Sequence, residues 1–169
     1  ITGKVIHDCR RTFRPLTLLD GCCTYSVGDN VNSFGDFSDI QTAVDHLPDE
    51  GGRICVLPGV HLANLAILNR EGITIHGCGE KSILRPTLKD QDQPVIFISS
   101  SDDICIEGLT IEAARGVGIL VRDHGDGPFS HSTNIKIHNN QIIAQFLGVG
   151  IIVKESAIEN NIEISENKV

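Results

Sequence analysis

Three residues that could bind a metal ion or transfer a proton recur at a fixed interval. His76, Glu107 and His138 follow one another at spacings of 31 residues, and each directly follows an Ile-x-Ile triplet. On neighbouring coils of a repeated fold they would share one outward-facing column, with the backbones of His76 and His138 nearly ~10 Å apart. A metal ion needs donors about 2 Å away, so only convergent side chains would bind it. The column therefore predicts an exposed His-Glu-His ladder, with metal binding or proton transfer as the alternative.

The second candidate is a polar loop, residues 122–133, which is the longest excursion between two repeated strands. Long polar loops on rigid scaffolds often carry function. This loop concentrates Asp123, His124, Asp126 and His131, and calcium prefers oxygen ligands such as these carboxylates. No complete calcium-loop pattern is present. No cofactor is therefore evident, and calcium is the ion that the loop could hold if it binds one.

Two charged pairs form the third candidate. Arg122 and Asp123 occupy positions equivalent to those of Lys154 and Glu155 one coil later. Such a mixed-charge patch could bind the carboxylate of an acidic sugar. The alternative, which we favour, is a set of paired surface charges that stabilises the fold by about 0–1 kcal/mol.

The elements that must position these residues are repeated strands. The Ile-x-Ile triplets recur at spacings of 31, 31 and 27 residues and begin at Ile73, Ile104, Ile135 and Ile162. A second strand repeats as well, because residues 116–123 match residues 148–155 at an offset of 32. Each unit is too small to close a core alone, so stacking is what removes its Ile side chains from water. The sequence predicts an all-β parallel β-helix of about four to five coils over residues 34–169, after a lead-in segment at residues 1–33.

A change of phase within each coil predicts where the chain bends. The inward-pointing residues of one coil should be Ile104, Ile106, Leu109 and Ile111. Their spacing shifts the alternation by one residue, so a bend is needed at Gly77, Gly108 and Asn139, residue types that tolerate a positive φ. Just past the bend, Asn140 and Asn167 should share a column in which their amides bond one another.

One amphipathic helix is predicted ahead of the strands. Its apolar residues fall at i, i+3, i+4 and i+7 and are Ile40, Ala43, Val44 and Leu47. Ser38 is the expected N-cap, Gln41 completes a capping box and Pro48 ends the run. We expect this helix to cover the N-terminal end of the solenoid, whereas nothing comparable follows Val169.

Composition and charge narrow the function classes. The net charge of −8 and pI of about 5.2 disfavour a nucleic-acid partner. No apolar run approaches the ~18–20 residues needed to cross a bilayer, and no signal peptide is visible. Six cysteines are present without an evident framework or zinc spacing, so we expect small, buried or half-buried thiols. The chain lacks Met, and we expect it to be an excerpt or a processed product.

Two segments carry a resemblance to a known family: FSDIQTAVD at residues 37–45 and GGRICVLPGVH at residues 51–61. Together with the Ile-x-Ile repeats, they resemble the pectin-lyase-like superfamily of right-handed parallel β-helices, over residues 34–169. The resemblance implies a fold rather than a reaction. The superfamily includes polysaccharide lyases, hydrolases and epimerases, along with non-catalytic adhesins and phage or phage-tail-like fibres.

The catalytic motifs expected of such enzymes are not recognisable here, and the chain has no Trp to serve as a sugar platform. The leading expectation is a non-catalytic β-helix module of an extracellular or phage-tail-like assembly, which contacts a polysaccharide or a partner protein subunit. The alternative is a polysaccharide lyase, hydrolase or epimerase whose active site lies partly outside this segment. A homo-oligomer through the uncapped C-terminal end is the expected form of self-association.

Overall fold

The computed structural model describes residues 23–122, 131–145, 148–154 and 161–169. One sheet contains β1 (Tyr25–Val27), β2 (Gly52–Val56), β3 (Gly59–Leu62), β5 (Glu71–Arg85), β7 (Asp102–Ala113), β9 (Thr133–His138), β10 (Gln141–Ala144) and β12 (Ile162–Ser165). The smaller sheet contains β4 (Leu65–Leu68), β6 (Ile96–Ser99), β8 (Val117–Arg122) and β11 (Val149–Lys154).

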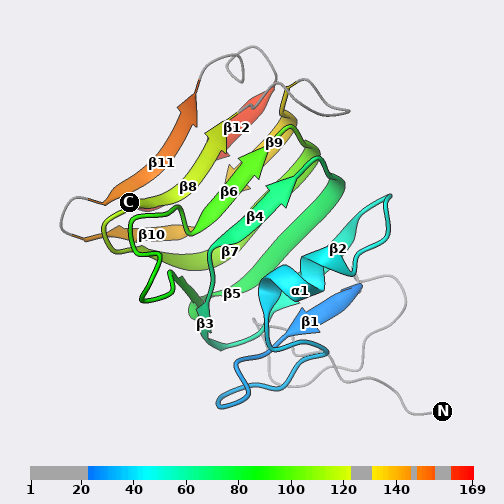
Figure 1. Cartoon of the computed structure of the whole chain (residues 1–169), viewed down its shortest axis with the longest axis vertical. Coiled ribbons are helices and arrows are strands. Elements are labelled where there is room, and N and C mark those ends of the chain that lie inside the picture. Colours follow the sequence, from blue (N-terminus) through cyan, green and yellow to red (C-terminus); the bar gives the residue numbers. More distant parts are fainter. Residues whose placement is uncertain (1–22, 123–130, 146–147, 155–160) are drawn as a thin grey trace.

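These strands form a parallel β-solenoid of about 4 turns, in which the two sheets face each other across one core (Figure 1). The larger sheet has the order β1-β2-β5-β7-β9-β12, with β3 beside β5 and β10 beside β7, and the smaller has the order β11-β8-β6-β4. The predicted all-β parallel β-helix is therefore confirmed. Among the described residues, no helix is long and apolar enough to cross a membrane.

The predicted register is confirmed. Ile73 pairs with Ile104, Ile104 with Ile135, and Ile135 with Ile162, so the four residues form one row along the axis. The first three are completely buried, and Ile162 packs against the same core. Burial of each such side chain stabilises the fold by about 1.5–3 kcal/mol.

A column of residues with a left-handed backbone conformation precedes the row of isoleucines. The residues just before the inward-facing strand segments have positive φ values and are Gly51, Gly72, Asp103, Asn134 and Asn161. Gly, Asn and Asp are the residues that adopt this conformation at the lowest cost. Each coil therefore turns into the larger sheet through the same backbone geometry.

The predicted bends are correct at Gly108 and Asn139, whose φ values are 65° and 54°. The expectation for Gly77 is wrong, because the positive φ falls on Gly79, where the pairing of β5 with β7 shifts its register. Gly77 is needed for a different reason. A Cβ atom there would collide with the carbonyl oxygen of Gly108 and the side chain of Leu109.

The predicted asparagine column is confirmed. The Asn140 side-chain amide donates to Asn167 Oδ1 at 3.0 Å and to the Ile106 carbonyl at 3.0 Å, and its own oxygen accepts from the Leu109 amide at 3.1 Å. Asn140 is 2% exposed. Its side chain therefore satisfies backbone groups of the bend that water does not reach.

The predicted helix is α1 (Ile40–Asp45), which lies at the β1 and β2 end of the solenoid (Figure 1). The expectation of a Ser38 N-cap is wrong: Asp39 is the N-cap, and its carboxylate accepts from the Thr42 amide at 2.7 Å. Gln41 does not complete a capping box. Its side-chain oxygen instead accepts from the Ala66 amide of β4 at 2.8 Å, and its amide donates to the Ala66 carbonyl at 3.1 Å.

The first strand and the cysteines differ from expectation. β1 lies within the segment assigned to a lead-in, yet it pairs with β2, so the larger sheet begins before residue 34. The expectation of thiols is wrong for Cys23 and Cys55, which form a disulfide, and for Cys78, which is also disulfide-bonded. Cys105 is free and half-buried, as predicted.

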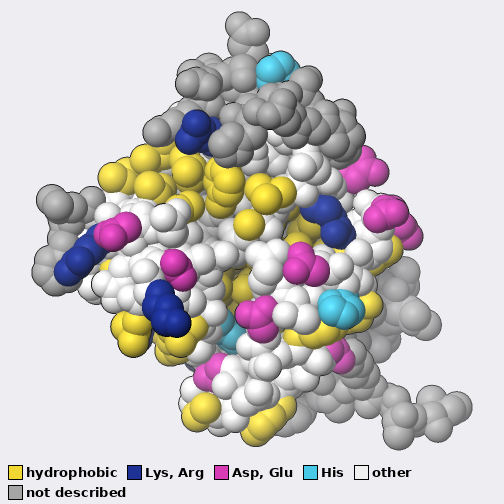
Figure 2. All heavy atoms as spheres, viewed as in Figure 1, with side chains coloured by type: hydrophobic (Ala, Val, Ile, Leu, Met, Phe, Trp, Pro, Cys, Tyr) yellow, Lys and Arg dark blue, Asp and Glu magenta, His cyan; other side chains and the backbone are white. Residues whose placement is uncertain are grey.

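The outer face of the smaller sheet is partly apolar. Figure 2 shows hydrophobic side chains gathered over β6, β8 and β11, while acidic and basic side chains are interspersed over the rest of this view. Phe97, Leu120 and Ile152 are aligned on these strands and are half-buried. The search for a functional site therefore turns to the larger sheet, whose outer face carries charged residues.

Candidate functional site

The predicted His-Glu-His column lies on the outer face of the larger sheet, where β5, β7 and β9 approach the bend. His76 pairs with Glu107 and Glu107 with His138 in the strand register. His76 Nδ1 lies 2.9 Å from Glu107 Oε1, and His138 Nε2 lies 3.0 Å from Glu107 Oε2. The side chains of His76 and His138 therefore converge on the Glu107 carboxylate.

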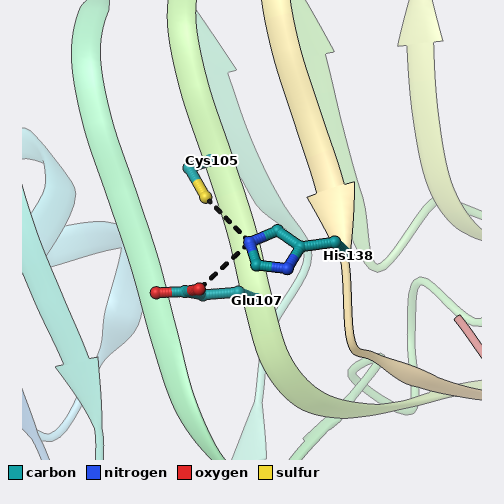
Figure 3. Close-up of side chains that lie close together, drawn as sticks. All are labelled: Cys105, Glu107 and His138. Carbon is teal, nitrogen blue, oxygen red and sulfur yellow. Dashed lines mark hydrogen bonds and ion pairs between the residues drawn. The ribbon is translucent and has the colours of Figure 1, made fainter. Parts of the chain in front are cut away.

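Two further residues join this column. Arg53 on β2 reaches across to Glu107, with Nη2 3.2 Å from Oε1. Cys105 lies two residues before Glu107 on the same face of β7, and its Sγ is 3.7 Å from His138 Nε2 (Figure 3). We call these five residues the Glu107 cluster: Arg53, His76, Cys105, Glu107 and His138.

Sequence reasoning missed Arg53 and Cys105. A signal for them was present, because the register places Arg53, Thr74, Cys105, Lys136 and Glu163 in one row. Every second residue of a strand faces the same side, so this row lies beside the row that contains Glu107. An inspection of the positions two residues before each column member would have found Cys105, and the same row extended by one coil to β2 contains Arg53.

The electrostatics of the cluster centre on one carboxylate and one neutral thiol. Both oxygens of Glu107 are in contact with nitrogen atoms of side chains on β2, β5 and β9, and its side chain is 21% exposed. Burial, followed by the negative charge of Glu107, raises the pKa of the Cys105 thiol to about 11, although the positive charges of Lys136 and Arg53 oppose this rise. Cys105 is therefore protonated near neutral pH.

Charge pairs continue along the larger sheet. Lys136 Nζ lies 3.6 Å from Glu163 Oε2 on the adjacent strand, and both side chains are about half-exposed. A hydrogen bond from Ser165, followed by the charge of Lys136, lowers the pKa of Glu163. Exposed pairs of this kind contribute little stability, so an anionic ligand could replace the Glu163 carboxylate at low cost. The Lys136 ammonium group is accessible to such a ligand because its side chain is about half-exposed.

The other predicted site residues are only partly described. Asp123, His124, Asp126 and Glu155 lie outside the described residues, so the calcium expectation and the mixed-charge patch stay predictions. Arg122 is exposed at the end of β8 and is aligned with Lys154 of β11, as the repeat predicted. His131 is exposed at the start of the next described segment.

The Glu107 cluster also offers metal donors. One donor atom from each of Cys105, Glu107 and His138 lies within 4.8 Å of the other two. Thiolate, imidazole and carboxylate are all ligands of zinc-like ions. The chemistry available to the cluster is therefore anion binding through Arg53, proton exchange between Glu107 and His138, or metal binding.

No protein-family model and no curated protein matches the chain. Among solved structures, it resembles a pectin methylesterase mutant in complex with a hexasaccharide, at 14% identity and a TM-score of 0.58, over 79% of this chain and 49% of that one. The fold is that of the pectin-lyase-like β-helices. Escherichia coli YbhC is similar at 16% identity and a TM-score of 0.58, over 91% of this chain and 50% of that one.

The resemblance implied by residues 37–61 and the repeats is thus confirmed for the pectin-lyase-like fold. The chain spans about half the length of both solved structures. At these identities the likeness concerns the fold, and the reaction has to be argued from the site.

Proposed function

We propose that the chain is a non-catalytic β-helix module that binds an acidic polysaccharide along the outer face of its larger sheet, on the side of the bend that carries the Glu107 cluster. The observation that carries this proposal is the state of Glu107, whose two carboxylate oxygens are both engaged by side chains of the Glu107 cluster. Glycoside hydrolysis ordinarily uses two carboxyl groups at a defined separation. The cluster contains one, which suits holding a ligand better than cleaving it.

The cations of this face are suited to uronic acid sugars. Arg53 is 33% exposed and Lys136 is 47% exposed. Both lie in one row across the coils, separated by Thr74 and Cys105. Arginine and lysine bind carboxylates through charge-assisted hydrogen bonds. An extended polymer could follow the regular spacing of the coils, and one solved structure of the same fold is a complex with a hexasaccharide.

The cysteines favour an oxidising location. Disulfides such as Cys23–Cys55 form and persist mainly in extracellular and comparable compartments. This supports an extracellular or appendage-associated module, in which a partner subunit is the alternative occupant of the same face.

Calorimetric titration of the full chain with oligogalacturonates of increasing length tests the proposal. We expect affinity that grows with length, falls with added salt and drops in Arg53→Ala and Lys136→Ala. Arg85→Ala is the matched control, because Arg85 pairs with Glu112 beyond the bend at 2.6 Å. Absence of binding, or equal losses in the control, would contradict the proposal.

A polysaccharide lyase, hydrolase or epimerase is the second candidate. The 3.0 Å contact between Glu107 and His138 provides an acid–base pair, and the fold is shared with a pectin methylesterase. Incubation with acidic polysaccharides, followed by assays for unsaturated products, reducing ends and released methanol, tests this candidate. Any turnover that Glu107→Ala abolishes would overturn the non-catalytic assignment.

A further inference from the structure

Three donor atoms of different chemical types meet on the outer face of β7 and β9. Cys105 and Glu107 project from the same side of β7, and His138 of β9 lies directly opposite Glu107 in the register (Figure 3). We propose that Cys105 Sγ, Glu107 Oε2 and His138 Nε2 form a binding site for a zinc-like transition-metal ion. This site goes beyond glycan binding and does not depend on it.

The distances suit such an ion. Cys105 Sγ lies 3.7 Å and Glu107 Oε2 lies 3.0 Å from His138 Nε2. Tetrahedral zinc, with bonds of about 2.3 Å to sulfur and 2.0–2.1 Å to nitrogen or oxygen, separates its donors by roughly 3.3–3.6 Å. The two distances to His138 Nε2 therefore need shifts of a few tenths of an ångström. Cys105 Sγ and the carboxylate oxygen, which lie within 4.8 Å of each other, would approach by at most about 1.5 Å, without any change of strand register.

The surroundings already orient the carboxylate. Glu107 Oε1 is held by His76 Nδ1 at 2.9 Å and by Arg53 Nη2 at 3.2 Å, which leaves Oε2 directed at His138. Outer-shell partners that fix a ligand in this way are a regular feature of protein metal sites. His76 and Arg53 are therefore positioning residues, and the repeat that aligns the strands builds the site.

The donor set also selects the ion. Sulfur and imidazole favour zinc and its transition-metal relatives over calcium, which prefers oxygen ligands. On binding, the Cys105 S–H bond breaks, its proton passes to solvent and a sulfur–metal bond forms, so no oxidant or reductant is required. The thiolate and carboxylate charges then balance a divalent ion. Three protein ligands leave a fourth position for water.

Titration of the full chain with Co²⁺, used as a spectroscopic substitute for Zn²⁺, tests the site in the absence of any glycan. The chain is prepared without a histidine tag, because the imidazoles of a tag would bind the ion. We expect a sulfur-to-cobalt charge-transfer band in the near ultraviolet that saturates at one ion per chain. Added Zn²⁺ should displace the cobalt and abolish the band.

Variants locate the site. Cys105→Ser should abolish the charge-transfer band, and His138→Ala should abolish binding. His76→Ala removes only a positioning residue and should weaken binding about 10–100-fold. His46→Ala is the matched control, because His46 is an exposed histidine at the end of α1, and it should bind like the wild type.

Circular dichroism verifies that each variant remains folded. Two outcomes would overturn the proposal: no saturable binding by the wild type, or cobalt spectra that lack the sulfur band and are unchanged in Cys105→Ser. Because no oligosaccharide is present, failure here is separate from failure of the glycan titration.

Discussion

The reactivity of the Cys105 thiol depends on the residues around it. Cys105 is the free thiol among the described cysteines, it is half-buried, and the Glu107 carboxylate lies two residues away on the same face. Both burial and that negative charge disfavour the thiolate. The reactivity of this thiol is therefore a direct probe of the Glu107 cluster.

Alkylation of Cys105 should be slow and strongly dependent on pH. The pKa rises from 9.0 to about 11, so at a pH below both values the thiolate fraction is about 100-fold lower than for an ordinary thiol. The iodoacetamide rate, followed by mass spectrometry of the Cys105 peptide, should still be rising at pH 9.5. Glu107→Gln should accelerate it, whereas the control Glu112→Gln should not. A rate that levels off near pH 9 would contradict the burial of the thiol.

Asn140 is a buried polar residue that holds the backbone of the bend. Asn140→Ala leaves the Leu109 amide and the Ile106 carbonyl without the partners described above, in a position that water does not reach. We expect a loss of about 1–3 kcal/mol in the free energy of unfolding, measured with denaturant. Asn167→Ala, in the same column but half-buried, should cost less. An equal loss in both variants would show that burial is not the cause.

Individual residues mark the limit of sequence-based prediction. The Asn140–Asn167 column follows from the repeat alone and was predicted correctly. The positive φ at Gly79 could not be predicted in the same way, because β5 contains extra residues after His76 that shift its pairing with β7. Arg53 and Cys105 were missed because their importance depends on side chains that converge across strands.

Among the elements, α1 closes the solenoid by pairing with a strand edge. Gln41 bonds both backbone groups of Ala66 in β4, in the way a neighbouring strand would. Ile40, Ala43 and Val44 bury the apolar side of the helix against the core. The 3.6-residue period predicted this helix and its buried face. The hydrogen bonds from Gln41 to β4 could not be predicted, because the sequence does not show which strand lies beside the helix.

The contribution of the N-cap of α1 to stability can be tested by substitution. Asp39→Ala removes the hydrogen bond to the Thr42 amide and should lower the free energy of unfolding by about 0.5–2 kcal/mol. Ser38→Ala is the matched control and should change stability little, since Ser38 is exposed and is not the cap. Chemical denaturation of both variants gives the comparison. A larger loss in Ser38→Ala would reverse the assignment of the cap.

Across the whole molecule, the fold was predictable because the apolar residues whose burial drives folding recur at a regular spacing in the sequence. Ile73, Ile104, Ile135 and Ile162 recur at almost one period, and stacking is the arrangement that buries all of them. The disulfide was not predictable, because Cys23 and Cys55 are 32 residues apart in sequence, yet their Cα atoms are 5.7 Å apart in space. That distance depends on β1, whose periodicity is too weak to identify from three residues.

Removal of the Cys23–Cys55 disulfide should destabilise the chain. The double variant Cys23→Ser/Cys55→Ser frees a loop of 32 residues, and chain entropy predicts a loss of about 3–4 kcal/mol. Denaturant unfolding under non-reducing conditions measures it. Cys105→Ser, which removes a free thiol, should cost much less. Comparable losses in the two would argue against a stabilising crosslink.

The same bridge determines how the module would respond to mechanical tension. Residues 24–54, which include β1 and α1, lie inside the loop that Cys23 and Cys55 close. A pulling force applied at Cys23 passes through the sulfur atoms directly into β2, so the hydrogen bonds of β1 and the contacts of α1 bear no load. If the module is part of an appendage under shear, β1 and α1 would remain in place while the force acts on the coils that follow them.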